Sequence, residues 1–494
     1  MTEKLQKARD YEALHRPELV NQLPAYHLTG GVGWINDPNG FAPYKGEYHL
    51  FFQYYPYDTQ WGPMHWGHAK TKDFIRWEFL PAALAPDAQY DSSGCFSGGA
   101  LELPDGRHLL LYTGVEIRPE GEFQTQCVAI GDGVNYEKYE GNPVITAADI
   151  PEGSSTRDFR DPKIWQENGV YYAVTVNRGK DGSGDVLLYE SQDGLHWERA
   201  SILYSCGYRF GSMWECPDFF HLGGKDILIH SVMEMRAKTP EYHNGNCKMY
   251  HIGHTDAEKH FHAEVSHAME FGLDFYAPQT LEALDGRRIM IGWMQAWEGA
   301  KQKIPGMGFM GQMTVPRELT LRDGRLLQWP VRELESYRAN KAEYRNVTIQ
   351  EETALPGITG KVMDLDLEIA PTETPYTRFT LEINRGDGFH TDIILFPQKG
   401  TIRLDRTFGG HPHDVNHIRE FPADFQNGAI RLRLLLDCYS AELFVGDGQQ
   451  AASMVLYAPE EADGITLRAD AAVQVSMEKY DLEITENWRT NHGK

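Results

Sequence analysis

The chain has 494 residues, with 47 Lys and Arg against 71 Asp and Glu, and a formal net charge of −24 at pH 7. Nucleic acids and anionic membranes are bound by basic surfaces, so this acidic balance argues against both as partners. The length suggests two or three domains. We therefore expect a multidomain globular protein that binds neither nucleic acid nor membrane.

The N-terminal segment, residues 1–29, is charged, and its first twenty residues have helical spacing. It contains no apolar run of signal-peptide length, and no later run is long enough to span a bilayer. These features predict a cytoplasmic location. The six cysteines are scattered without a Cys-x-x-Cys pair, so we expect neither a disulfide framework nor a zinc site.

From residue 30 to residue 330 the sequence reads as short apolar and aromatic strands separated by Gly, Asp and Asn turns. An Asp followed four residues later by an aromatic residue recurs at Asp73, Asp132 and Asp193, and a looser copy begins at Asp256. The copies lie 59 to 63 residues apart. A fixed period of this length indicates a β-propeller, and a fifth unit would complete five blades. We expect each Asp to close a turn between outer strands.

The pattern changes after residue 330. Residues 331–344 are predicted to form a helix or a linker, because part of this segment has helical spacing. Residues 345–494 contain segments that alternate apolar and polar residues between turns, as two-sheet sandwiches do. The predicted fold class is therefore all-β, with a five-bladed β-propeller over residues 30–330 and a C-terminal β-sandwich over residues 345–494.

Three acidic residues occupy the same phase of the repeat. Asp37 in "WINDPNG", Asp161 in "FRDP" and Glu215 in "WECPD" lie 32 to 41 residues before a copy of the turn motif. That phase is the start of the first strand of a blade, which lines the central channel of a propeller. We therefore expect the three carboxylates to converge at one mouth of the channel. Two carboxylates that flank a glycosidic bond are the standard means of cleaving it, and clustered acids raise one another's pKa.

The motifs resemble those of glycoside hydrolase family 32, the β-fructofuranosidases that include invertases, sucrose-6-phosphate hydrolases and fructanases. The three acidic motifs match the hallmarks of that family, and "WGPMHWGHA", "DFYAPQT" and "MTVPREL" are similar to its secondary motifs. The resemblance covers about residues 27 to 330, and "DCYSAELFVGDG" is similar to the appended β-sandwich of the family. It implies retaining hydrolysis of terminal β-D-fructofuranosides through a covalent fructosyl-enzyme, without a cofactor. Sucrose, sucrose 6-phosphate and short fructo-oligosaccharides are the implied substrates.

The resemblance also implies roles for individual residues. Asp37 would be the nucleophile, Glu215 the general acid and base, and Asp161 the stabiliser of the transition state. The implied substrate-binding residues are Asn36, Gln53, Trp61, Phe96, Ser97, Arg160, Tyr276 and Trp293. No metal is expected. We also expect the amides of the turn around Asp37 to hold the pKa of its carboxyl low.

One position departs from the family pattern, which usually has Ser-Gly-Ser after the Phe of the second blade. This chain has "FSGGA", so Gly99 is expected to remove a hydroxyl near the rim of the pocket.

Two other functions remain open. A fructosyltransferase, in which a sugar replaces water as the acceptor, uses the same three acids. A non-catalytic sugar-binding propeller would be indicated by the loss of an acid, and all three are present. The sequence leaves open whether a 6-phosphate is required and whether the chain forms a homo-oligomer.

Overall fold

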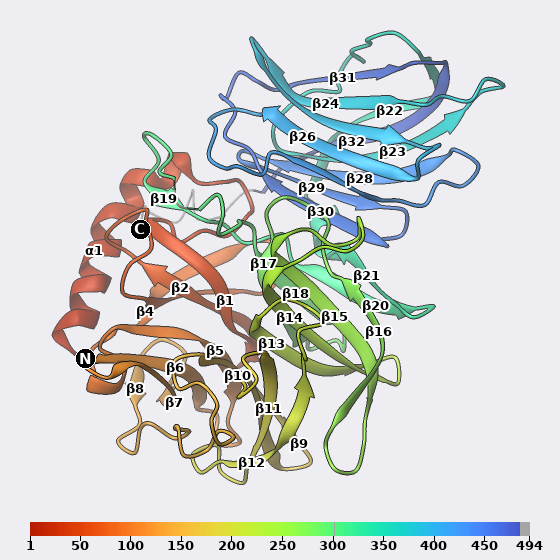
Figure 1. Cartoon of the computed structure of the whole chain (residues 1–494). Helices are drawn as coiled ribbons and strands as arrows, with labels where there is room; N and C mark the ends of the chain where they lie inside the picture. Colours follow the sequence, from red (N-terminus) through yellow and green to blue (C-terminus); the bar gives the residue numbers. More distant parts are fainter. Residues whose placement is uncertain (301, 485–494) are drawn as a thin grey trace.

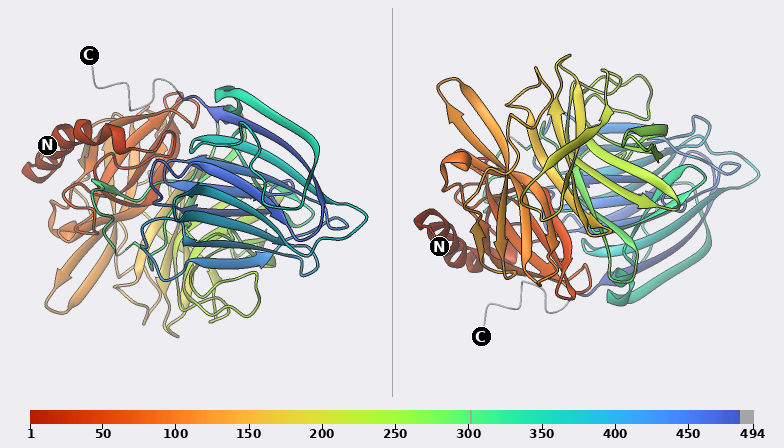
Figure 2. Two further views of the ribbon diagram at one scale, coloured as in Figure 1. Left: turned by 90° about the horizontal axis from the view of Figure 1, so that it is seen from above. Right: turned by 90° about the horizontal axis from the view of Figure 1, so that it is seen from below.

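The computed structural model describes residues 1–300 and 302–484, and β-sheets make up most of this part of the chain. The helix α1 (Glu3–Leu19) confirms the helical spacing of the N-terminal segment, and it lies along the outside of the first sheet (Figures 1 and 2). Its N-terminus is capped by Thr2, whose hydroxyl accepts a hydrogen bond from the Leu5 amide. Two short 3-10 helices are η1 (Val20–Gln22) and η2 (Gln89–Asp91). No helix in these ranges is both long and apolar enough to cross a membrane.

Five sheets follow one another along residues 33–330. The first contains β1 (Gly33–Tyr44), β2 (Glu47–Tyr55), β3 (His65–Thr71) and β4 (Trp77–Leu84), with β19 (Phe309–Met310) beside β1. The second contains β5 (Gly94–Glu102), β6 (His108–Arg118), β7 (Gly121–Gly131) and β8 (Tyr136–Lys138). The third contains β9 (Phe159–Glu167), β10 (Val170–Arg178), β11 (Gly184–Ser191) and β12 (Glu198–Ser205). The fourth contains β13 (Met213–Leu222), β14 (Lys225–Met235), β15 (Gly245–Thr255) and β16 (Phe261–Ala268), and the fifth contains β17 (Tyr276–Glu282), β18 (Arg288–Trp293), β20 (Arg317–Arg322) and β21 (Arg325–Pro330).

The first strands of these five sheets contact one another in a closed ring. β1 contacts β5, β5 contacts β9, β9 contacts β13, β13 contacts β17, and β17 contacts β1. The short strand β19 comes after β18 in the chain but pairs with β1 in parallel, so it joins the fifth unit to the first. Residues at one end of the first strands therefore lie close together, although up to about 240 residues separate them in the sequence.

The repeated Asp residues lie between the third and fourth strands of the first four sheets. Asp73, Asp132 and Asp193 each accept hydrogen bonds from the backbone N–H groups two and three residues later. The looser copy, Asp256, accepts one from the N–H group four residues later. This is how an Asp side chain stabilises a tight turn. The prediction that these residues close turns between outer strands is confirmed.

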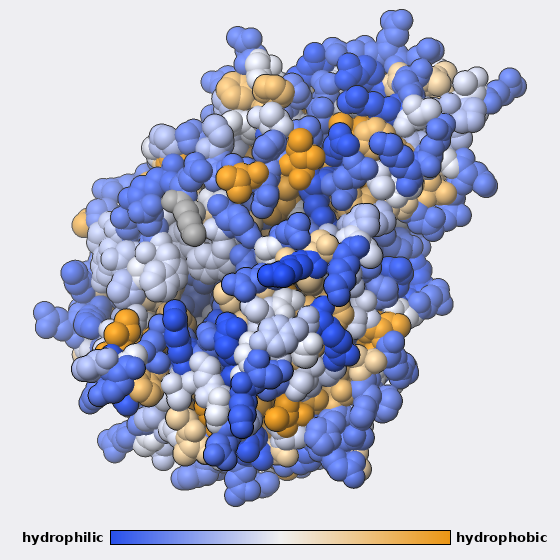
Figure 3. All heavy atoms as spheres, viewed as in Figure 1, coloured by the Kyte–Doolittle hydropathy of each residue, from blue (hydrophilic) through white to orange (hydrophobic). Residues whose placement is uncertain are grey.

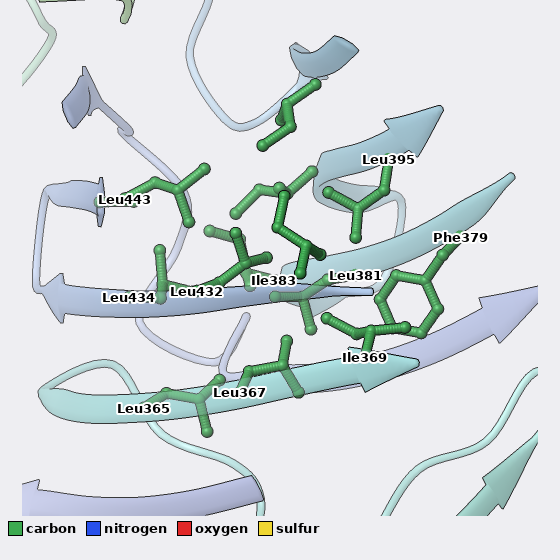
Figure 4. Packing of buried hydrophobic residues seen from close by; sticks show 14 of the residues in the cluster. Leu365, Leu367, Ile369, Phe379, Leu381, Ile383, Leu395, Leu432, Leu434 and Leu443 are labelled. Atoms are coloured by element: carbon green, nitrogen blue, oxygen red, sulfur yellow. The ribbon is translucent and has the colours of Figure 1, made fainter. Parts of the chain in front are cut away.

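Two larger sheets contain the later strands, drawn in cyan to blue in Figure 1. One has the order β22 (Arg338–Ile349), β32 (Val473–Leu482), β23 (Met363–Pro371), β28 (Ile430–Asp437), β29 (Ser440–Val445) and β30 (Gln450–Val455). The other has the order β27 (Ile418–Pro422), β26 (Thr401–Phe408), β25 (Phe389–Phe396), β24 (Phe379–Gly386) and β31 (Gly464–Ala469). Alternate residues of both sheets, such as Leu365 and Leu367 in β23 and Leu381 and Ile383 in β24, form one buried cluster (Figure 4).

The helix or linker expected over residues 331–344 is present only in part. The 3-10 helix η3 covers Arg332–Tyr337, and residues from Arg338 onward form β22, so helix is wrong for residues 338–344. Antiparallel pairing with β32 gives this segment its backbone partners, and Ala342 and Tyr344 pack against the buried cluster. Sheet pairing and burial therefore override the helical preference of the local sequence.

A buried ionic cluster joins the N-terminal segment to the later sheets. His27 Nδ1 lies 2.8 Å from Asp437 Oδ2, and His27 Nε2 lies 2.8 Å from Glu442 Oε1. Arg317 of β20 also donates to Glu442, from Nε at 3.2 Å. Burial alone would lower the pKa of His27, but the two carboxylates outweigh it and raise the pKa to about 9. The face of the molecule drawn in Figure 3 is mostly hydrophilic, with small scattered apolar patches.

Candidate active site

All five first strands carry a β-bulge at the same end, with one extra residue relative to the second strand. The bulges lie between Ile35 and Pro38, Phe96 and Gly98, Arg160 and Lys163, Glu215 and Asp218, and Tyr276 and Gln279. Bulges re-aim side chains and leave a backbone N–H without a ladder partner, which explains why Pro is tolerated inside three of them. Asp161, Cys216 and Ala277 adopt positive φ values of 62°, 49° and 49° there. Such backbone is uncommon outside Gly and is held by the surrounding structure.

Asp37 lies in the first of these bulges and is surrounded by hydrogen-bond donors from three strands. Ser97 Oγ donates to Asp37 Oδ2 at 2.6 Å, and the Cys216 thiol donates to the same oxygen at 3.3 Å. Asn36 Nδ2 donates to Oδ1 at 3.1 Å, while its own amide oxygen accepts from Trp34 Nε1 at 2.8 Å. The sequence neighbour Asn36 and two side chains from other strands therefore fix the orientation of the Asp37 carboxylate.

The expected direction of the Asp37 pKa is wrong. Burial raises the pKa of Asp37 above its ordinary value, and repulsion from Glu215 adds to this. The hydrogen bonds from Ser97, Asn36 and Cys216 act in the opposite direction but do not compensate. The hydrogen-bond donors expected from the sequence are present. The cost of burying the charge depends on the other four sheets, so it could not be predicted from the residues next to Asp37 in the sequence.

Asp161 lies beside Asp37 across the Cys216 side chain. The Cys216 backbone N–H donates to Asp161 Oδ2 at 3.0 Å, and the Cys216 sulfur lies 3.6 Å from the same oxygen. Burial, with repulsion from Glu215 and Asp37, raises the pKa of Asp161 to about 7, against the attraction of Arg160. Burial and these carboxylates also raise the pKa of the Cys216 thiol, so it keeps its one proton, with an oxygen of each acid within reach of the sulfur.

Glu215 is held by two side chains from neighbouring strands. The Tyr276 hydroxyl donates to Glu215 Oε2 at 2.6 Å, and Arg160 Nη2 donates to Oε1 at 3.0 Å. Burial and the charge of Glu215 raise the pKa of Tyr276, so its phenol remains a donor. Arg160 is also paired with Asp158 at 3.3 Å. Arg160 Nε also lies 3.9 Å from Asp161 Oδ2, so Asp37, Asp161 and Glu215, which the sequence predicts to converge, belong to one network of hydrogen bonds and ion pairs.

The remaining predicted residues differ in their exposure. Trp61 is 47% exposed, and its ring meets the ring of Phe96 edge-on at 6.1 Å. Gln53 is buried and donates to the Cys95 carbonyl at 3.0 Å. Trp293 is completely buried, with its ring 5.8 Å from that of Trp34, so it supports Trp34 and offers no surface to a ligand.

The structure also contains a contact that the sequence did not suggest. The Thr113 hydroxyl of β6 accepts a hydrogen bond from the Asp161 backbone N–H at 2.9 Å. No sequence motif pointed to Thr113, because it lies on a second strand and outside the acidic motifs.

The surroundings of Gly99 correct one expectation. A Cβ atom on Gly99 would lie 2.9 Å from the Ile164 nitrogen of β9. Gly99 therefore allows two first strands to approach, and the expectation that it faces the pocket rim is wrong.

A cavity of about 520 Å³ lies at the opposite ends of the first strands, where Tyr44, Lys163 and Arg288 are among the residues that line it. Asp37, Asp161 and Glu215 do not line this cavity. The titratable cluster is at the bulged ends, so we assign the candidate active site to those ends and not to the cavity.

The sequence models of known families match most of the chain. The model of the glycosyl hydrolases family 32 N-terminal domain matches residues 27–330, and the family 32 C-terminal model matches residues 333–485. A sucrose-6-phosphate hydrolase from Zymomonas mobilis is 36% identical over 462 residues, which cover 90% of this chain and 88% of that protein. A raffinose invertase from Escherichia coli is 34% identical over 464 residues, with 90% and 92% covered.

Solved structures agree with these matches. A GH32 beta-fructofuranosidase from Bombyx mori, a mutant of which was solved in complex with sucrose, is 32% identical with a TM-score of 0.82, and the match covers 97% of this chain and 98% of that chain. The sucrose-6-phosphate hydrolase structure from Lactobacillus gasseri has a TM-score of 0.84 at 24% identity, covers 97% and 96% of the two chains, and supports the fold alone. Over nearly its whole length, this chain belongs to glycosyl hydrolase family 32.

Proposed function

We propose that this protein hydrolyses the terminal β-D-fructofuranosyl bond of sucrose-type substrates. The observation that carries the proposal is that carboxylates from three different sheets belong to one partly buried network of hydrogen bonds and ion pairs at the bulged ends of the first strands. Burial of like charges is costly, and such clusters are found where acid–base chemistry is done. The relatives named as sucrose-6-phosphate hydrolases and an invertase support the substrate class.

The closed ring of first strands supports a five-bladed β-propeller over residues 30–330. The shared buried cluster of the two later sheets supports a β-sandwich beginning near residue 345. The last ten residues of that predicted domain, 485–494, lie outside the described residues. In this arrangement the channel mouth is a rigid site built from five sheets, with residues 331–344 joining the two domains.

Each acid has a distinct role in the proposed reaction. Asp37 attacks the anomeric carbon of the terminal fructose and forms a covalent fructosyl-enzyme, while Glu215 protonates the leaving oxygen. Glu215 then removes a proton from the incoming water, which releases fructose with retention of configuration. Asp161 accepts hydrogen bonds from fructose hydroxyls as positive charge develops. The donors around Asp37 stabilise its charged form, which the attack requires.

The other residues of the site have supporting roles. Arg160 and Tyr276 hold the two oxygens of Glu215, and Asn36 and Ser97 hold those of Asp37. We assign sugar contacts to these four residues and to Gln53. Trp61 and Phe96 provide an apolar wall, and Trp293 supports Trp34. A small fructoside is the proposed partner. A cytoplasmic location stays a prediction from the sequence, which leaves the oligomeric state open.

The test compares initial rates on sucrose, sucrose 6-phosphate, kestose and inulin, with free glucose and fructose quantified separately at high sucrose. Hydrolysis releases the two sugars from sucrose in equal amounts. Free glucose in excess over fructose, together with longer fructosides, would instead identify a fructosyltransferase. Bound sucrose without products would identify a non-catalytic sugar-binding protein. The ratio of kcat/KM on the two sucrose forms tells whether a 6-phosphate is required.

A further inference from the structure

The segment between β16 and β17 lies along a strand of the later sheets. The Phe271 backbone N–H donates to the Ala451 carbonyl of β30 at 2.9 Å, and the N–H groups of Leu273 and Asp274 donate to the Ser453 carbonyl at 2.9 and 3.0 Å. A Cβ atom on Gly272 would lie 2.2 Å from the Ser453 nitrogen, so only Gly allows this approach. The backbone that leads into β17 is therefore held by the edge of β30.

Arg406 of β26 ties the same segment to the second of the later sheets. Its guanidinium donates to Asp274 and Asp414, and also to the Val455 carbonyl at 2.8 Å. Asp274 is fully buried and accepts a further hydrogen bond from the Val455 N–H at 2.8 Å. A buried carboxylate is strongly disfavoured without its partner, so the Arg406 pair fixes where Asp274 can lie.

Asp274 precedes Tyr276 by only two residues. The Tyr276 hydroxyl donates to Glu215 Oε2 at 2.6 Å, and the intervening Phe275 is buried. The chain beyond Tyr276 is also constrained, because Ala277 has a positive φ and its N–H donates to Ser231 Oγ at 2.9 Å. A shift of Asp274 would therefore move the Tyr276 ring relative to Glu215.

We propose that Arg406 is a positioning residue for the general acid, acting through Asp274 and Tyr276. The later sheets thus contribute to catalysis without touching the substrate. The inference rests on the proposed function, in which Glu215 donates the proton to the leaving oxygen. A displacement of the order of 1 Å is sufficient to lower a catalytic rate substantially.

Arg406 is also connected to the site through Asp414. The test must separate an effect through Asp414 from an effect through Asp274 and Tyr276. A Cβ atom on Gly299 would lie 3.1 Å from Asp414 Cβ. The nearby Trp297 ring stacks 6.0 Å from Trp34, which supports Asn36 beside Asp37. A loss that travelled by this route would impair the nucleophile and would therefore slow every substrate equally.

The experiment compares Arg406→Met, Arg406→Lys and Asp274→Asn with a control, Arg403→Met. Arg403 is on the same strand but donates to Glu420 on a partly exposed face, at 2.9 Å. Each variant is assayed on sucrose and, by its leaving-group burst, on an aryl β-D-fructofuranoside that needs no acid assistance. We expect Arg406→Met and Asp274→Asn to lower kcat on sucrose about tenfold with little change in KM and in the burst rate, since the acid is displaced and not removed. Arg406→Lys should recover part of the loss, and the control should match wild type.

A double-mutant cycle with Tyr276→Phe tests the route. If Arg406 acts through the Tyr276 hydroxyl, Arg406→Met should cost less than about twofold in kcat once that hydroxyl is gone. Equal losses on both substrates, an additive cycle, or wild-type kcat in folded Arg406 and Asp274 variants would each overturn the inference. Asp274→Asn keeps the side-chain shape, so this variant can replace Arg406→Met in the assays if Arg406→Met does not fold. Should wild type itself fail to cleave sucrose-type fructosides, the proposed function fails and not the positioning role alone.

Discussion

Replacing Ser97 by Ala should shift the acid limb of the pH–rate profile to higher pH. Ser97 Oγ donates to Asp37 Oδ2 at 2.6 Å, the shortest of the three hydrogen bonds to this carboxylate, and Ser97 is only 5% exposed. This hydrogen bond stabilises the charged form of Asp37 and opposes the effect of burial, which raises the pKa. Its removal leaves burial less opposed, so the pKa of Asp37 rises further.

The size of the shift follows from the hydrogen bond that is lost. A hydrogen bond to a charged group contributes about 1.5–3 kcal/mol. One pKa unit corresponds to about 1.4 kcal/mol, so the pKa of Asp37 should rise by about 1 to 2 units. Because the rate rises as Asp37 loses its proton, the acid limb of kcat/KM should move upward by the same amount. The limb belongs to the coupled acids, so the shift between variants is compared and not the absolute value.

The assay measures kcat/KM on sucrose across pH for wild type, Ser97→Ala and the control Ser191→Ala. Ser191 also donates to an aspartate, Asp193, at 3.1 Å, but in a turn at the outer edge of the third sheet. Loss of a sugar contact by Ser97 would lower the whole profile without moving its limb. An acid limb that stays in place or moves to lower pH in a folded Ser97→Ala protein would refute the reasoning.

Two further predictions concern other parts of the molecule. His27 has a folded pKa of about 9, above its unfolded value of about 6.5. The stability that protonated His27 contributes is therefore full below pH 6.5, is lost as the pH rises through 9, and amounts to ~3 kcal/mol. Urea unfolding should show that the free energy of unfolding falls more steeply with pH over this range in wild type than in His27→Gln. Equal slopes in the two proteins would contradict this prediction. Trp61→Ala removes a half-exposed ring beside Phe96, so KM for sucrose should rise about fivefold with an unchanged melting temperature, and an unchanged KM would exclude Trp61 from the site.

The sequence was sufficient to predict the features that depend on local side-chain chemistry and on the period of the repeat. The turn role of Asp73, Asp132 and Asp193 follows from side-chain hydrogen bonding within four residues, and their period places Asp37, Asp161 and Glu215 on first strands. The same pattern predicted successive units of short strands over residues 30–330, and five sheets follow one another there.

Features that depend on distant contacts could not be predicted. The strand at residues 338–344 exists because β22 pairs with β32, more than 100 residues later. The pKa of Asp37 is set by burial within five sheets, and its local donors suggested the opposite direction. Gly99 faces β9, and Arg406 meets Asp274 across 132 residues. None of these contacts leaves a periodic signal in the sequence.

The central claim is that Asp37 forms a covalent bond to fructose, and intact-mass measurement tests it directly. Glu215→Gln is mixed with an aryl β-D-fructofuranoside whose leaving group needs no proton, so that the first step proceeds while the activation of water is impaired. The account predicts that the protein gains the mass of one fructosyl group and that peptide mapping places it on Asp37. Release of the aryl group with no adduct, or an adduct on another residue, would contradict it.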